Sequence, residues 1–111
     1  MPSKTVPFAV MTALERLGEN IRRARVRRRM SQDELADACG ISRKTLYALE
    51  HGEPGTSLAT AFSVLWHLGL LDSTAALADP EADEHGSILE AARAPKRVRS
   101  GDRRDAIDND F

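Results

Sequence analysis

Gly40 lies between two short stretches with helical periodicity, and this arrangement constrains the fold more than any other feature of the sequence. The stretch Gln32–Cys39 follows Ser31, and the stretch Arg43–Glu50 follows Ser42. Serine is a preferred N-cap of helices, and glycine readily adopts the left-handed conformation that ends a helix. The sequence therefore predicts two short helices joined by a sharp turn.

Small and apolar residues at fixed offsets fit the packing of two crossing helices. Ala36 is small enough for a close approach, and Gly40 makes the turn four residues later. Five apolar positions hold the second helix against the first: Leu35, Cys39, Ile41, Leu46 and Leu49. This spacing predicts a helix-turn-helix motif.

Three further segments before the C-terminal tail have helical spacing, and none reads convincingly as a strand. A helix over residues 12–29 is predicted, with Thr12 and Glu15 as a capping box. Its apolar stripe consists of Leu14, Leu17, Ile21 and Ala24. A mostly buried helix over 58–68 has as inward residues Leu58, Ala61, Phe62, Leu65, Trp66 and Leu68. A shorter helix around 74–77 makes five.

The sequence divides into an N-terminal arm (1–11), a helical domain (12–78) and a C-terminal tail (79–111). The arm is either an irregular lead or a segment that covers the domain or a partner subunit. The tail has too few apolar residues for a second core, so we expect it to be mostly irregular, with one or two helical turns at 88–92. The expected fold class is all-α.

The formal net charge of −1 conceals an uneven distribution of charge along the chain. Residues 12–52 contain nine Lys and Arg and six Asp and Glu, whereas residues 53–94 contain seven acidic residues and one Arg. The basic part is therefore the one suited to a polyanion. Arginines gather on the outer side of the first predicted helix: Arg16, Arg22, Arg23, Arg25, Arg27, Arg28 and Arg29.

We expect a protein without catalytic, metal or cofactor sites. His51, His67 and His85 are scattered, and the single Cys39 is expected to be a small buried residue rather than a ligand or a reactive thiol. Neither a phosphate-binding glycine loop nor a nucleophile motif occurs. No apolar run reaches the about 18–20 residues that span a bilayer, and no secretory signal is recognisable. These features favour a cytoplasmic location.

Residues 15–71 resemble the DNA-binding domains of phage repressors and Xre-type regulators, because they combine the motif with flanking helices. The resemblance implies a five-helix phage-repressor-like fold in which the second motif helix lies in the major groove. The residues expected at the bases are Arg43, Lys44, Thr45 and Tyr47. Those expected at phosphates are Gln32, Ser31, Ser42, Arg27, Arg28, Arg29 and His51.

Several of these residues also have a purely structural interpretation. Ser31 and Ser42 are equally explained as N-caps, and His51 as a cap of the helix C terminus. Arg43 and Lys44, taken alone, indicate a solvated first turn, although the helix dipole slightly disfavours cations there. Within the motif we favour contact of both with bases.

The segment DPEADEHGSILEAARAPKRVR and the final DNDF resemble the tail of HipB-type antitoxins. This resemblance implies a homodimeric, nucleoid-associated repressor that binds a palindromic operator and neutralises a HipA-type serine/threonine kinase toxin. Phe111 is then either an anchor in a pocket of the toxin or a frayed terminus. The dimer contact is expected from the fifth helix, residues 6–11 or the tail. The alternatives are a stand-alone Xre-family regulator and an adaptor that binds proteins but no DNA.

Overall fold

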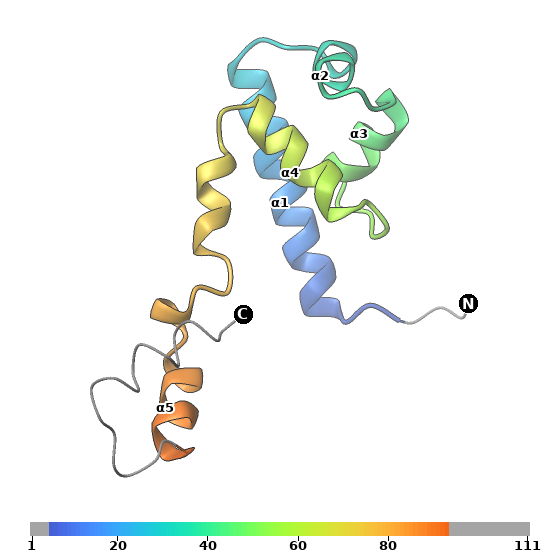
Figure 1. Ribbon diagram of the computed structural model, residues 1–111. Helices are drawn as coiled ribbons and strands as arrows, with labels where there is room; N and C mark the ends of the chain where they lie inside the picture. Colours follow the sequence, from blue (N-terminus) through green and yellow to red (C-terminus); the bar gives the residue numbers. More distant parts are fainter. Residues whose placement is uncertain (1–4, 94–111) are drawn as a thin grey trace. The chain divides into compact units, whose positions relative to one another are not determined.

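The computed structural model describes residues 5–93, which contain helices and no strand (Figure 1). The α-helices are α1 (Phe8–Arg27), α2 (Gln32–Cys39), α3 (Arg43–Glu50), α4 (Leu58–His67) and α5 (Glu84–Arg93). Two 3-10 helices, η1 (Leu71–Ala76) and η2 (Pro80–Ala82), lie between α4 and α5 in the chain. The predicted all-α fold class is confirmed. The chain divides into two compact units, with the boundary between Ala75 and Ala76.

The start of α1 differs from the prediction. The helix begins at Phe8, so the predicted start at Thr12 and the capping box with Glu15 are wrong. Pro7 precedes the helix, and no side chain caps it. Proline suits a helix start because its ring fixes φ and because its missing N–H is not needed there. Residues 8–11 therefore belong to α1 rather than to an arm.

A left-handed turn at Arg29 ends α1 two residues before the predicted end. Arg29 has a φ of 55°, which is uncommon for a residue with a side chain. Its N–H donates to the Val26 carbonyl at 2.9 Å, and the Met30 N–H donates to the Arg25 carbonyl at 3.2 Å. These two bonds form a Schellman motif, which satisfies the last carbonyls of the helix.

The predicted bounds of α2 and α3 are confirmed. Ser31 and Glu34 form the expected capping box: the Glu34 N–H donates to Ser31 Oγ at 3.0 Å, and the Ser31 N–H donates to Glu34 Oε1 at 2.8 Å. Gly40 has a φ of 72° and ends α2 in the left-handed conformation. Ser42 then caps α3, so only two residues separate the turn glycine from the next helix.

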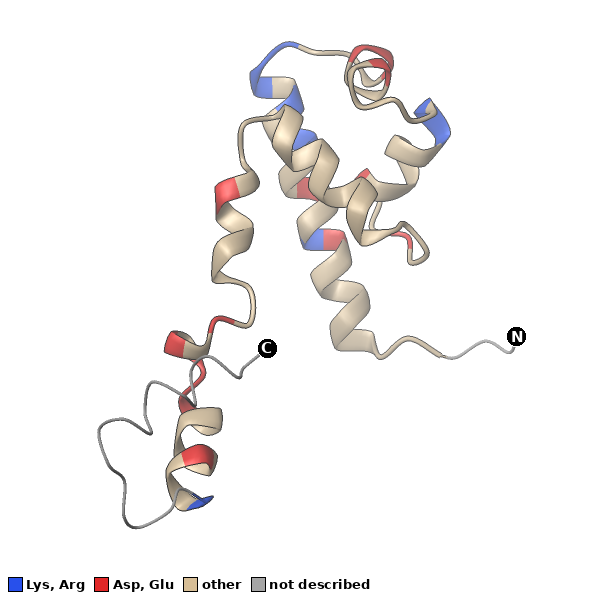
Figure 2. Ribbon diagram, in the orientation of Figure 1, with Lys and Arg blue, Asp and Glu red and all other residues tan. Residues whose placement is uncertain are grey.

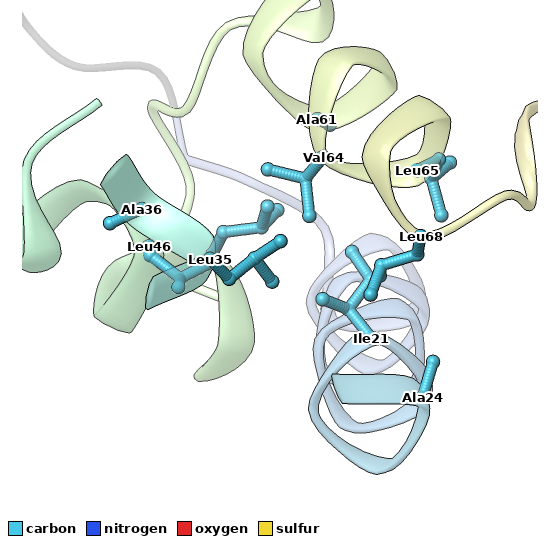
Figure 3. Packing of buried hydrophobic residues seen from close by; sticks show 10 residues of the cluster. Ile21, Ala24, Leu35, Ala36, Leu46, Ala61, Val64, Leu65 and Leu68 are labelled. Carbon is cyan, nitrogen blue, oxygen red and sulfur yellow. The ribbon is translucent and has the colours of Figure 1, made fainter. Parts of the chain in front are cut away.

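Side chains from α1, α2, α3 and α4 form one hydrophobic core (Figure 3). Its buried members are Ile21, Ala24, Leu35, Ala36, Leu46, Leu49, Ala61, Val64, Leu65 and Leu68. Leu58 and Trp66 are 69% and 61% exposed, so the prediction that they face inward is wrong. The buried stripe of α4 runs through 61, 64, 65 and 68, the i, i+3, i+4, i+7 spacing of one helix face, and residue 66 lies off that face.

The segment after α4 is not an α-helix at the predicted position. The sequence predicts a short helix around residues 74–77, whereas the structure has η1 at Leu71–Ala76. The hydroxyls of Ser73 and Thr74 donate to the carbonyls of Leu70 and Leu71, each at 2.7 Å. These bonds three residues back accompany the tighter 3-10 winding.

The described part of the tail is more regular than predicted. In place of one or two turns at 88–92, α5 extends over ten residues. Asp83 Oδ1 accepts from the Gly86 N–H at 2.9 Å, which stabilises an earlier helix start. No residue of α5 is buried, and Ile88 and Leu89 are 66% and 48% exposed. Within residues 5–93, no helix is long and apolar enough to cross a membrane.

Candidate nucleic-acid interface

The first turn of α3 presents two exposed cations, Arg43 and Lys44. Ser42 Oγ accepts from the Thr45 N–H at 3.0 Å and donates to Thr45 Oγ1 at 2.9 Å, so this turn is held at its start. The opposite side of α3 is fixed in the core by Leu46. The two cations therefore project from a helix that cannot rotate without breaking the core.

Tyr47 and His51 continue the exposed side of α3 toward its C-terminal end. Their rings stack with centroids 3.8 Å apart, and His51 Nδ1 lies 2.9 Å from the Tyr47 carbonyl oxygen. Residues 43, 47 and 51 are spaced by four, so they share one helix face. His51 thus occupies the C-cap that the sequence left as an alternative, while Tyr47 stays 48% exposed.

A polar hollow lies where the end of α1 and the starts of α2 and α3 converge. Its lining consists of Arg25, Ser31, Gln32, Asp33 and Arg43. The structure therefore brings the predicted phosphate contacts Ser31 and Gln32 to the same place as the predicted base contact Arg43. Arg43 Nε lies 3.9 Å from Asp33 Oδ1, and both side chains are exposed.

A buried carboxylate that the sequence analysis missed holds this region together. The Glu50 side chain is fully buried and accepts from Arg25 Nε at 2.7 Å and from Arg25 Nη2 at 3.0 Å. Gln32 Nε2 donates to the same carboxylate at 3.0 Å. Arg25 Nη1 also donates to the Met30 carbonyl at 2.9 Å. This network ties the last residue of α3 to α1 and to the first residue of α2.

The placement of Arg25 on the solvated side of α1 is therefore wrong, since its side chain is only 11% exposed. The position of Arg25 in the sequence does not distinguish it from the neighbouring arginines of α1. The available signal was Glu50, an acid directly after Leu49 and four residues after Leu46 on the apolar side of α3. A buried acid requires a cationic or hydrogen-bonding partner, which the nearby arginines supply.

The remaining predicted phosphate contacts lie at the end of α1. Lys and Arg residues gather there and at the start of α3 (Figure 2). Arg27, Arg28 and Arg29 are all exposed, and Arg28 Nη1 donates to the Ala24 carbonyl at 2.8 Å. The Arg28 guanidinium thus bonds to a carbonyl of its own helix end, and its remaining N–H groups are available to bind an anion.

Neither the single cysteine nor any acidic cluster provides a second kind of site in the described residues. Cys39 is half-buried and packs against the core, and this burial raises the pKa of its thiol. A raised pKa keeps the thiol protonated and less nucleophilic. Among residues 5–93, no group of His, Cys, Asp and Glu is arranged to hold a metal ion. Phe111 lies outside the described residues.

Comparisons with known proteins agree with this geometry. Residues 21–70 match the helix-turn-helix family model, and no curated protein matches the chain. The matched residues include α2, α3, the Glu50 network and the polar hollow. Residues 21–70 therefore form an Xre-like helix-turn-helix domain, the DNA-binding type found in transcriptional regulators.

Proposed function

We propose that this protein is a sequence-specific transcriptional repressor in which α3 reads bases in the major groove. The observation that carries this proposal is the exposed pair Arg43 and Lys44 at the start of a helix whose opposite face is locked in the core. Arginine and lysine suit guanine, whose O6 and N7 accept two hydrogen bonds, and Thr45 and Tyr47 extend the contact. The role is binding and not catalysis.

Phosphate contacts complete this mode of binding. Gln32, the first residue of α2, donates one N–H of its side-chain amide to Glu50. The second N–H of this amide is available for a phosphate. Arg27, Arg28 and Arg29 place three positive charges at the end of α1. Phosphate contacts supply most of the affinity that is independent of sequence, and base contacts supply the specificity.

The proposal is tested by selecting a preferred duplex from random DNA and measuring affinities by fluorescence anisotropy. Arg43→Ala should weaken specific binding by about 1–3 kcal/mol and relax the preference at one base pair. Arg28→Ala should weaken all sequences alike and reduce the salt slope by about one. Arg16→Ala removes the same charge from the first half of α1 and serves as the control. Unchanged specific affinity in Arg43→Ala would contradict the assignment of the reading helix.

A homodimer on a palindromic operator is part of the proposal, and an apolar groove supports it. The groove has a volume of about 260 Å³ and lies between the first half of α1 and the turn after α3. Its apolar lining includes Val6, Val10, Leu14, Leu17, Leu49, Leu58 and Ala61. Val10 and Leu58 are 44% and 69% exposed, which leaves apolar area for a second copy of the chain. Of the three contacts expected from the sequence, this favours residues 6–11.

The position of the groove leaves the reading end of α3 accessible. It adjoins Leu49 and Gly52, at the end of α3 opposite to Arg43. A dimer contact there keeps the first turn of α3 free for DNA in both copies. Half-sites of such dimers lie about one turn of DNA, ~34 Å, apart.

Leu58→Asp tests the dimer, because Leu58 is exposed in the single chain and its replacement should not disturb the core. We expect tight binding to the palindrome to be lost while the affinity for a half-site is retained. Leu89→Asp places the same charge on α5 and tests the tail as the dimer contact. A palindrome affinity that Leu58→Asp leaves intact would contradict the groove assignment.

The finer role that we propose is that of the antitoxin of a type II toxin–antitoxin module, which neutralises a HipA-type serine/threonine kinase toxin. It is supported by the resemblance of the tail and by Ile88 and Leu89, which α5 leaves exposed for a partner. A kinase-fold gene in the same transcript would favour this role over a stand-alone Xre-family regulator. Removal of residues 106–111 should weaken toxin binding if Phe111 is an anchor; unchanged affinity would eliminate the anchor.

A further inference from the structure

We propose that Asp33 determines the base specificity of this protein by positioning Arg43. This inference rests on the proposed function, since it concerns the residue assigned there to the bases. Asp33 is the second residue of α2, and Arg43 is the first residue of α3. The pair therefore joins the starts of the two motif helices across the turn at Gly40.

The geometry assigns different roles to the edges of the Arg43 guanidinium. Its Nε lies 3.9 Å from Asp33 Oδ1, and Asp33 is the only acidic partner of Arg43 among the described residues. A guanidinium presents its N–H groups in a rigid fork. Nε is the guanidinium nitrogen paired with the carboxylate, and no hydrogen bond within the described residues occupies the two Nη atoms. The two Nη atoms are therefore free for guanine O6 and N7, which require two parallel donors.

The exposure of Asp33 and Arg43 to water determines how strongly they attract each other. The two side chains are 66% and 71% exposed in the free protein, where such a pair contributes little. They line the polar hollow together with Ser31 and Gln32, both predicted phosphate contacts. DNA on this face would exclude water from the hollow, and the attraction between Asp33 and Arg43 would then strengthen.

The negative charge of Asp33 allows a role in base specificity to be distinguished from a role in overall DNA affinity. A carboxylate beside predicted phosphate contacts repels every DNA sequence alike. Its presence therefore weakens general binding, while its hold on Arg43 favours one base pair. An acid in a first helical turn also stabilises the helix dipole, but that effect changes the stability of α2 and not the choice between bases.

The test measures how strongly the protein discriminates between two base pairs rather than how tightly it binds one duplex. The wild-type protein is used to select a preferred duplex, and the contacted G·C pair is then replaced by A·T. We expect D33N to tighten binding to unrelated DNA and to lower the G·C preference by at least about threefold. D37N, which neutralises an exposed acid of the same helix, should leave the preference unchanged. Circular dichroism confirms that the variants keep their helices.

A double variant excludes a direct contact of Asp33 with a base. In the R43A background, D33N should no longer change the preference, because the residue that Asp33 positions is absent. Asp33 has no positioning role if D33N retains the full preference, or if its effect persists without Arg43. Failure of the wild type to enrich any duplex would instead contradict the proposed function itself.

Discussion

α3 and α5 are helices of similar length with apolar and charged sides, but only α3 has its apolar side covered. Leu46 of α3 is 0% exposed, whereas Ile88 and Leu89 of α5 are 66% and 48% exposed. α3 ends in a fully buried carboxylate with three hydrogen bonds, and the acids of α5 are exposed. An amphipathic pattern therefore does not by itself show that the apolar side of a helix is covered, and the covering decides how much each residue stabilises.

The largest difference in stability between α3 and α5 is expected when one acidic residue of each helix is neutralised. Glu50→Gln leaves the positive charge of Arg25 in a site with little access to water, so the free energy of unfolding should fall by about 3–5 kcal/mol. Glu90→Gln in α5 should change it by less than about 0.5 kcal/mol. Urea unfolding followed by circular dichroism measures both. Equal effects of the two variants would contradict the importance of the buried network.

The same comparison applies to leucines. Leu46→Ala removes a fully buried side chain at the centre of the core and should cost about 2–5 kcal/mol. Leu89→Ala removes a half-exposed side chain and should cost much less in the isolated protein. Thermal unfolding of both variants provides the measurement. A large loss in Leu89→Ala would mean that α5 is covered in the free protein.

Glycine-to-alanine changes in α1 and α5 should differ in the size of their effect. A Cβ atom at Gly18 would lie 2.5 Å from the carbonyl oxygens of Leu49 and Glu50, so Gly18→Ala must separate α1 from α3 and should cost about 1–3 kcal/mol. The atoms nearest to a Cβ at Gly86 in α5 belong to the Asp83 carboxyl group, which can move but also accepts from the Gly86 N–H. Gly86→Ala should therefore weaken this cap while favouring the helix interior, so that the helix content changes little, as circular dichroism would reveal.

The cap of α3 is expected to contribute less than its core contacts. Ser42→Ala removes the acceptor of the Thr45 N–H and should lower stability by about 1 kcal/mol. Ser87→Ala in the first turns of α5 serves as a matched control without a capping bond to lose. The two midpoints of urea unfolding should differ; identical midpoints would show that the cap of α3 is not limiting.

The smallest effect is expected for an exposed ion pair on α1. The hydrogen bond from Arg22 lowers the pKa of Glu19, although both side chains are about half exposed. A lowered pKa in the folded state stabilises the protein above the ordinary pKa of glutamate, and this contribution is lost as the pH falls through the lowered value. Glu19→Gln should thus differ slightly from wild type at neutral pH and converge with it as the pH falls below the lowered pKa. A difference that grows in acid would contradict this pKa shift.

Local signals explain what the sequence analysis predicted well. Ser31, Ser42 and Gly40 mark helix ends through bonds within a few residues, so the bounds of α2 and α3 were correct. The predicted start of α1 is wrong because Thr12 offers a plausible cap, whereas the helix begins after Pro7, whose fixed φ suits a helix start without a capping side chain. The hydrophobicity of Trp66 predicts an inward position, but the spacing of Ala61, Val64 and Leu65 excludes it from the buried face.

The sequence by itself determined the two motif helices, the turn between them and the cations at the start of α3, because caps and periodicity act over short distances along the chain. Only the tertiary structure decided that Arg25 serves Glu50, that Gly18 permits the close approach of α1 and α3, and that Asp33 faces Arg43. The physical reason is that each of these depends on the angle between helices. That angle is set by the packing of the whole core and by no local pattern.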